Sequence, residues 1–83
     1  MKIQIKYFAS IREALGTGSE AFDAKASTVA GLRDELIARG GAYAGALARG
    51  KAVRIAVNQV LSGETAPLLE GAEIAFFPPV TGG

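Results

Sequence analysis

The sequence predicts a small α+β domain in which one mixed β-sheet packs against one main helix. Polar and apolar residues alternate along 2–8, 53–58 and 73–77, as they do in strands that bury one face. One longer segment, 28–39, carries its apolar residues at helical spacing instead. The chain has 83 residues, of which 49% are apolar and 20% charged, so we expect a single domain over residues 1–83 with one core.

The first two strands are predicted in the N-terminal part of the chain. Residues 2–8 give a half-buried strand, and its core-facing side chains are Ile3, Ile5 and Tyr7. Phe8 falls on the outer face of this strand by the same alternation. Residues 10–15 predict a short helical turn, and residues 19–24 predict a second, weaker strand that carries Phe22.

The main helix begins after Thr28, because threonine is a good N-cap. Its apolar stripe should face the sheet and consists of Val29, Leu32, Leu36 and Ile37. We expect the polar side chains of this helix in solvent, namely Arg33, Asp34 and Arg39. Gly40 and Gly41 end the helix. Residues 42–48 predict at most one more helical turn, which fills space between the main elements.

Three further strands are predicted in the C-terminal half. Residues 53–58 give the third strand, and a tight turn at 58–59 leads into a short strand at 60–61. Residues 62–72 predict a loop. Residues 73–77 form the last strand, with two inward side chains, Ile74 and Phe76. This order of strands around one helix is typical of a β-grasp fold.

The sheet face that no helix covers should be polar, yet it carries large apolar side chains. Phe8 and Phe77 fall on this face by alternation, and Leu61 joins them. Contiguous exposed apolar patches mark partner-binding sites, and aromatic residues are enriched at the centres of such interfaces. We therefore expect Phe8, Leu61 and Phe77 to form a partner-binding patch.

Charge and composition exclude several classes of function. The formal net charge is +1 with both signs interspersed, so nucleic acid is not an expected partner. The chain starts directly with a strand pattern, and we expect neither a signal peptide nor a membrane span, hence no membrane partner. Cysteine is absent, and the simplest compartment for such a chain is the reducing cytoplasm.

The folded part of the sequence has no residue set for bond-making chemistry. His and Cys are absent, which removes the commonest general base, the thiol nucleophile and the usual zinc ligands, so no metal is expected. The serines have no histidine partner, and the acidic residues are scattered along the chain. The glycines match neither a P-loop nor a dinucleotide fingerprint. We expect no bound cofactor.

The end of the chain should project from the fold. Pro78 and Pro79 cannot extend a central strand, because proline lacks the amide donor and has a fixed φ. We expect a flexible, reactive tail over residues 79–83, of which 80–83 span roughly 13 Å when extended. The full segment beyond the last strand is Pro78, Pro79, Val80, Thr81, Gly82 and Gly83. A frayed terminus without function is the alternative.

The carboxylate of Gly83 is the one group with a plausible covalent role. Two terminal glycines keep the tail narrow enough to enter a cleft of another protein. A carboxylate is a poor electrophile, whereas its mixed anhydride with AMP can be attacked by a thiol, a persulfide or an amine. No basic residue follows Val80, so the ATP used in such an activation must be bound by a partner.

The last eight residues are Phe76-Phe77-Pro78-Pro79-Val80-Thr81-Gly82-Gly83. This segment resembles the C-terminal signature of the molybdopterin synthase small subunits. Similar segments are Ala56-Val57-Asn58-Gln59 and, near the start, Tyr7-Phe8-Ala9 and Ile11-Arg12-Glu13. The resemblance covers the whole chain. It implies a ubiquitin-like β-grasp sulfur carrier with a protruding C-terminal tail, which is not an enzyme by itself.

The resemblance further implies three successive partners. A ubiquitin-activating-like adenylyltransferase would use ATP to adenylate Gly83, and a persulfide sulfur donor would convert it to a thiocarboxylate. The tail would then enter the large catalytic subunit of molybdopterin synthase and donate sulfur to cyclic pyranopterin monophosphate. The implied assembly is a heterotetramer with a small subunit at each end of a dimer of large subunits. Three basic residues are implied to help docking: Arg12, Lys51 and Arg54.

Other functions remain open on the residues alone. The chain could be a sulfur carrier for thiamine or cysteine synthesis, which has the same kind of terminus and a different acceptor. It could be a protein modifier, with Gly83 forming isopeptide bonds to lysines. It could also be an interaction domain with an inert tail. The Phe-Phe-Pro-Pro run favours the pterin pathway.

Overall fold

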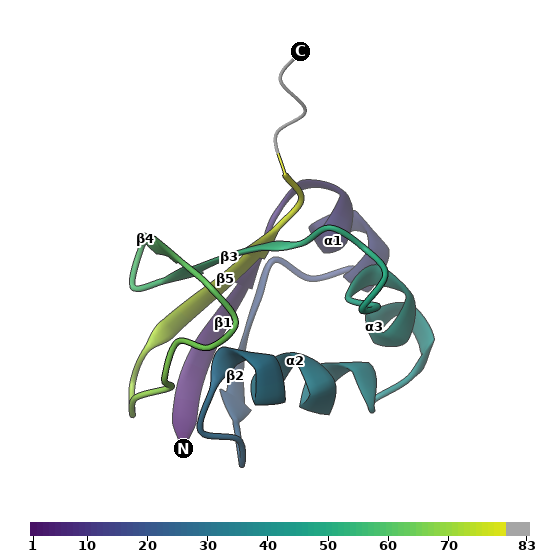
Figure 1. Cartoon of the computed structure of the whole chain (residues 1–83). Coiled ribbons are helices and arrows are strands. Elements are labelled where there is room, and N and C mark those ends of the chain that lie inside the picture. The colour runs from purple at the N-terminus through teal and green to yellow at the C-terminus, as the bar shows by residue number, and fades with distance from the viewer. Residues whose placement is uncertain (80–83) are drawn as a thin grey trace.

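The computed structural model describes residues 1–79, and residues 80–83 lie outside the described residues. Helices and strands follow one another along this part of the chain (Figure 1). They are β1 (Lys2–Tyr7), α1 (Ala9–Leu15), β2 (Ser19–Asp23), α2 (Val29–Ile37), α3 (Gly41–Ala46), β3 (Arg54–Val57), β4 (Val60–Ser62) and β5 (Glu73–Phe77). Within residues 1–79, no helix combines the length and the hydrophobicity that a membrane span requires.

The five strands form one mixed sheet in the order β2-β1-β5-β3-β4. β1 and β5 pair in parallel, with Ile5 opposite Ile74, and every other pair in this sheet is antiparallel. The main helix α2 packs on one face of the sheet, with α1 and α3 beside it (Figure 1). The α+β class and the β-grasp architecture predicted from the sequence are confirmed, although two short helices accompany the main one.

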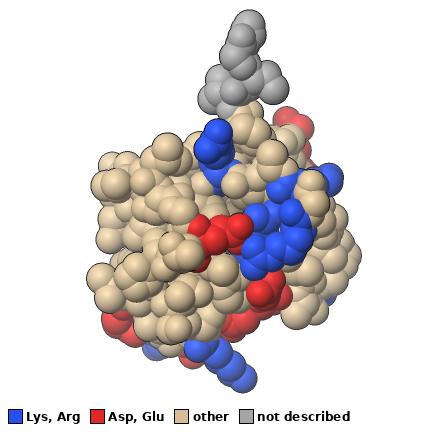
Figure 2. Space-filling view, in the orientation of Figure 1, with Lys and Arg blue, Asp and Glu red and all other residues tan. Residues whose placement is uncertain are grey.

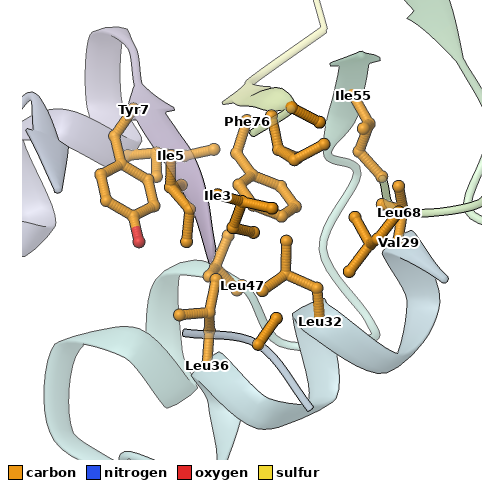
Figure 3. Close-up of a cluster of buried hydrophobic side chains, with 14 residues drawn as sticks. Ile3, Ile5, Tyr7, Val29, Leu32, Leu36, Leu47, Ile55, Leu68 and Phe76 are labelled. Atoms are coloured by element: carbon orange, nitrogen blue, oxygen red, sulfur yellow. The ribbon is translucent and has the colours of Figure 1, made fainter. Parts of the chain in front are cut away.

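The core lies between the sheet and the helices (Figure 3). The predicted inward side chains of β1 and β5 are 4% exposed or less: Ile3, Ile5, Tyr7, Ile74 and Phe76. From α2, Val29, Leu32 and Leu36 are fully buried as predicted. Each such side chain contributes roughly 1.5–3 kcal/mol through its burial. The period-2 and helical patterns therefore predicted the core faces of β1, β5 and α2 correctly.

The turn between β3 and β4 also matches its prediction. Asn58 and Gln59 have positive φ angles of 49° and 70°, which a two-residue type I′ hairpin requires at both positions. The side chain of Asn58 accepts a hydrogen bond from the amide of Glu73 at 2.9 Å. The turn is thereby fixed to the start of β5.

The segment after α2 does more than fill space, so that expectation was wrong. It forms α3 and ends in Leu47, whose side chain is fully buried in the core. Tyr43 packs edge-on against Tyr7, with ring centroids 6.3 Å apart. The alanines and glycines around Leu47 weaken the apolar pattern in the sequence, which hides its contribution to the core.

The expectation that Arg33 lies in solvent was also wrong, because this residue is only 3% exposed. Its Nε donates to the carbonyl of Leu47 at 2.8 Å, and its Nη2 donates to those of Ala48 and Lys51 at 2.7 and 3.1 Å. Its Nη1 lies 3.5 Å from Oε2 of Glu64. These acceptors replace water, so the guanidinium is buried with its hydrogen bonds satisfied. The other two polar residues that were predicted to lie in solvent, Asp34 and Arg39, are exposed.

The start of α2 is tightly packed. Oγ1 of Thr28 accepts a hydrogen bond from the amide of Gly31 at 3.3 Å, which is the predicted cap. A Cβ added to Gly31 would lie 2.6 Å from Cβ of Ala26. Neither carbon can move without its backbone, so the close approach requires glycine at this position.

We expect Gly31→Ala to destabilise the fold by about 1–3 kcal/mol, because overpacking outweighs the helix propensity that alanine adds. The matched control is Gly45→Ala in α3, where an added Cβ meets no atom within 4 Å. That change should raise stability by about 0.5–1 kcal/mol. Urea unfolding followed by circular dichroism measures both effects. A Gly31→Ala protein as stable as the unaltered one would contradict the packing argument.

A polar cluster closes the side of the core next to β2. Oε2 of Glu20 accepts from the hydroxyls of Tyr7 at 2.9 Å and Tyr43 at 2.7 Å, and Oε1 accepts from Arg39 at 2.9 Å. The Arg39 guanidinium also lies 4.5 Å from the ring centroid of Tyr43. Partial burial acts to raise the pKa of Glu20, but the donated hydrogen bonds outweigh it, and the pKa lies below its ordinary value of 4.5.

This cluster should make stability depend on pH. Because the folded-state pKa of Glu20 is lowered, its carboxylate stabilises the fold fully above the unfolded pKa of about 4.5 and loses this effect as the pH falls through the folded pKa. Glu20→Gln should therefore be less stable than the unaltered protein at neutral pH, and the gap should narrow on acidification. Urea midpoints measured at a series of pH values test this. A gap that stays constant would count against the assignment.

Candidate functional site

The chain leaves the sheet from its central strand. β5 lies between β1 and β3, and its last residue, Phe77, is paired with Arg54 on β3. Pro78 and Pro79 follow without sheet pairing, and both are half-buried. The point at which the described chain ends lies opposite the N-terminus (Figure 1). The predicted exit after the last strand is therefore observed as far as Pro79.

The residues predicted to react lie beyond this point. Val80, Thr81, Gly82 and Gly83 are outside the described residues. The structure does describe the surface around Pro79, which we call the platform. That platform consists of the end of β5, the start of α1, and the segment that leads into β3.

The strand register places Leu61 and Phe77 on the same outer face of the sheet. Leu61 on β4 is opposite Ala56, which is opposite Ala75 on β5. Phe77 lies two residues further along β5 and therefore points to the same side. Leu61 is 66% exposed, and Phe77 is half-buried. The outer face thus presents Leu61 on β4 and Phe77 on β5, with β3 between the two strands and Phe77 next to the chain exit.

Phe8 reaches the same end of the molecule by a different route. The strand β1 ends at Tyr7 rather than at Phe8, which precedes α1 in an extended conformation. The amide of Phe8 donates to the carbonyl of Phe76 at 3.1 Å, so its backbone lies beside the end of β5. Its side chain is 46% exposed. Phe8 is therefore a surface residue near the exit, as predicted, although it is not part of the strand.

The three predicted basic residues lie at this end as well. Arg54 is opposite the last residue of β5, Lys51 lies with Pro78 along a surface hollow, and Arg12 lies on α1. Within residues 1–79 none of these three side chains forms an ion pair. On the upper half of the face in Figure 2, where the described chain ends, basic side chains cover more of the surface than acidic ones, although an acidic group lies beside the chain end. The exit is thus an electropositive region of a nearly neutral protein.

The acidic residues have other roles. Within the described chain, every carboxylate except that of Glu13 pairs with a cation or accepts a hydrogen bond: Glu20, Asp23, Asp34, Glu35, Glu64, Glu70 and Glu73. Glu35, for example, accepts from the amide of Ala26 at 2.8 Å. No three side chains of His, Cys, Asp or Glu gather in a metal-binding arrangement in residues 1–79. The negative charges therefore take part in contacts within the fold, except that of Glu13, which lies on α1 at the same end as the exit.

A hollow of about 120 Å³ beside Pro78 was not predicted from the sequence. Its walls come from α1, α3 and the segment before β3, and they include Ser10, Ala14, Ala46, Lys51 and Val53. Small side chains have no periodic signal, so of the residues that line the hollow only Lys51 and Pro78 were predicted as site residues. The abundance of Ala and Gly in residues 41–50 is the signal that could have revealed the hollow, because small residues leave space between elements.

The C-terminal signature has counterparts in known proteins. The profile of the ThiS family matches residues 5–83. The molybdopterin synthase sulfur carrier subunit of Escherichia coli (strain K12) is 44% identical over 81 residues, which cover 98% of this chain and 99% of that protein. The subunit of the same name from Haemophilus influenzae is 37% identical over the same shares of both chains.

Solved structures agree with the fold. SAMP1 from Haloferax volcanii superposes with a TM-score of 0.77 and 26% identity over the whole of both chains. A chain from the complex of subunits 1 and 2 of the molybdopterin-converting factor of Helicobacter pylori 26695 gives a TM-score of 0.66 and 26% identity, also over both whole chains. Fold, length and sequence therefore agree. The protein belongs to the ThiS family and is a homologue of the molybdopterin synthase sulfur carrier subunits.

Proposed function

We propose that this protein is the sulfur carrier subunit of a molybdopterin synthase. The observation that carries the proposal is the 44% identity to such a subunit over 98% of the chain. The architecture supports it, because the described residues bring no catalytic set together and the central strand ends at an apolar, electropositive platform. On its own the protein is a carrier, and the catalytic groups belong to its partners.

In the proposed cycle, the Gly83 carboxylate attacks the α-phosphate of ATP within an adenylyltransferase and releases pyrophosphate. The terminal sulfur of a persulfide then displaces AMP, and a thiol reduces the resulting acyl disulfide to leave a thiocarboxylate. In the large subunit the thiocarboxylate sulfur attacks a side-chain carbon of cyclic pyranopterin monophosphate and displaces the oxygen substituent there, and hydrolysis of the resulting thioester returns the carboxylate. Two such transfers supply both sulfur atoms of the dithiolene. We place this cycle in the cytoplasm, with ATP bound only by the partner.

The same surface should serve both partners. Phe8, Leu61 and Phe77 would supply the apolar contact, and the three basic residues named above would flank it. The likeness to a chain from a complex of subunits 1 and 2 supports binding of a second subunit. The terminus can enter a partner only where the exit faces that partner, which makes this end of the molecule the natural contact.

We expect Leu61→Glu to weaken binding to the large subunit by about tenfold or more, because truncation or charging of a central apolar contact typically costs over 1–2 kcal/mol. The matched control is Val60→Glu. Val60 is 65% exposed on the same short strand, but it is paired with Val57 and points to the other face. Its replacement should leave the affinity within about twofold. Isothermal titration calorimetry measures both, and equal losses in the two variants would contradict the assignment of the outer face.

A second candidate is a protein modifier whose Gly83 becomes joined to lysines of targets. It is favoured by the fold match to SAMP1, the small archaeal modifier protein 1 of Haloferax volcanii. Both functions use an activated C-terminal carboxyl group, so the fold cannot separate them. The difference lies in the acceptor, which is a pterin in one case and a lysine amine in the other.

A reconstituted reaction separates the two candidates. The thiocarboxylated protein is mixed with the large subunit and cyclic pyranopterin monophosphate, and molybdopterin is quantified. We expect molybdopterin in proportion to the thiocarboxylate consumed, and none from the carboxylate form. Failure with a large subunit that works with the Escherichia coli carrier would contradict the proposal. Lysine-linked adducts in cells would then support the modifier.

A further inference from the structure

The hollow beside Pro78 is built from elements that the core holds in place. Ala14 lies on α1 and Ala46 on α3, and both helices pack against the core through Ile11 and Leu47. The third wall is the segment that leads into β3, with Lys51. Most of the lining is apolar and small, and Lys51 is its one charged side chain. The hollow therefore offers apolar contact next to one ammonium group.

Two arginines fix the wall that carries Lys51. From α2, the buried guanidinium of Arg33 donates to the carbonyls of Ala48 and Lys51. In the opposite direction, Arg49 donates from this segment to the carbonyl of Ala30 at 2.9 Å and to Oδ1 of Asp34 at 2.8 Å. Segment 47–51 is thus bound to α2 from both sides. Because this wall is held by buried and charge-assisted hydrogen bonds, the hollow is formed before any partner arrives.

The charge pattern indicates what the hollow binds. Within residues 1–79, Lys51 has no anionic partner, and all but one of the carboxylates are engaged elsewhere. Arg12 on α1 and Arg54 on β3 add two cations without an ion pair at this end, against one carboxylate without a partner, that of Glu13 on α1. A partner that approaches here therefore meets a positive field around an apolar depression. The group on a partner that complements this hollow is an apolar side chain with a carboxylate beside it.

We propose that this hollow is a docking pocket for the large subunit, and that it takes an apolar side chain of that subunit with an adjacent Asp or Glu paired to Lys51. The inference rests on the proposed function. Pro78 is both a wall of the pocket and the start of the segment that ends in Gly83. A partner side chain bound in the pocket is therefore held within reach of Gly83, because residues 79–83 can span roughly 18 Å. Docking at this point sets how far the terminus reaches into the partner.

Two variants test the pocket. Ala14→Leu places a larger side chain on an exposed helical position and fills the hollow, and Lys51→Met removes the charge while keeping the stem. The matched controls are Ala42→Leu on an exposed position of α3 and Lys25→Met after β2, neither of which lines the hollow. Thermal unfolding of each variant is measured to check that the fold is retained.

The measurement is the affinity of each full-length variant for the large molybdopterin synthase subunit, at low and high salt. We expect at least about tenfold weakening for Ala14→Leu, since a buried apolar contact is lost. Lys51→Met should weaken binding about threefold and reduce its dependence on salt. Both controls should bind like the unaltered protein. Unchanged affinity in Ala14→Leu and Lys51→Met overturns the pocket alone, whereas no binding by the unaltered protein overturns the proposed function with it.

Discussion

We expect removal of Gly83 to abolish sulfur loading of this protein and to leave its fold unchanged. The expected loss is complete, because the reaction requires a carboxyl group at one defined distance from the docked body. Without Gly83 the new terminus lies roughly 3.5 Å short of that position. Displacement of a reacting group by a few ångströms removes the benefit of positioning. Loading is measured by thiocarboxylate formation with ATP, a sulfur donor and an activating enzyme.

A second tail variant and a control test whether the position of the terminal carboxylate determines loading. One residue added after Gly83 should also abolish loading, because it displaces the carboxylate by the same length in the other direction. Gly50→Ala is the control, since an added Cβ there meets no atom within 4 Å. It should load at the unaltered rate. If either tail variant formed the thiocarboxylate at the normal rate, Gly83 would not be the reactive residue.

Replacement of Arg33 by methionine should destabilise the fold by about 3–4 kcal/mol, because it leaves buried carbonyl groups without donors. The guanidinium has acceptors at Leu47, Ala48 and Lys51 and lies beside Glu64. A domain of this length has a total stability of roughly 4–12 kcal/mol. The single change would therefore remove a large share of it. Chemical denaturation at neutral pH measures the loss.

Arg54→Met is the matched control for this prediction. Arg54 is exposed on β3, and it has no ion pair within residues 1–79. Its replacement should change stability by no more than about 0.5 kcal/mol. Arg33→Lys should fall between the two, since an ammonium group keeps the charge but cannot reproduce the planar fork. Equal effects of the Arg33 and Arg54 changes would show that the buried hydrogen bonds contribute little.

The parts of the fold that sequence could predict are those with a strict period. Alternation in β1 and β5 identified Ile5 and Phe76 as core residues, and both are fully buried. The pair Asn58 and Gln59 was recognised as a turn because the strands on either side alternate. In each case the signal is local, since neighbouring residues along one element determine which side chains share a face.

The missed features depend on residues far apart in the chain. Arg33 looked like a solvent residue because its burial requires carbonyl groups from residues 47–51, which no helical pattern of α2 can indicate. Leu47 was underestimated because its neighbours are small. The hollow beside Pro78 arises where α1, α3 and the segment before β3 meet, and it is defined by the absence of bulk rather than by a motif.

The candidate site shows the same division. The sequence predicted the reactive role of Gly83 and the binding role of the outer-face residues, because the chemistry of the chain end and the alternation of a strand can both be read from the order of residues. The structure added how Leu61 and Phe77 share a face and why the unpaired cations lie near the exit. Most carboxylates in residues 1–79 pair with groups elsewhere in the fold, and only the three-dimensional structure shows these pairs. A protein with a net charge of +1 therefore has a local excess of positive charge at the chain exit.

The most direct test is the intact mass of the protein after incubation with ATP, a sulfur donor and an activating enzyme, with fragmentation to locate any change. A sulfur carrier should gain the mass difference between one sulfur and one oxygen, and the fragments should place this gain at Gly83. An unchanged mass, under conditions in which the same enzyme loads the Escherichia coli carrier, would contradict the account.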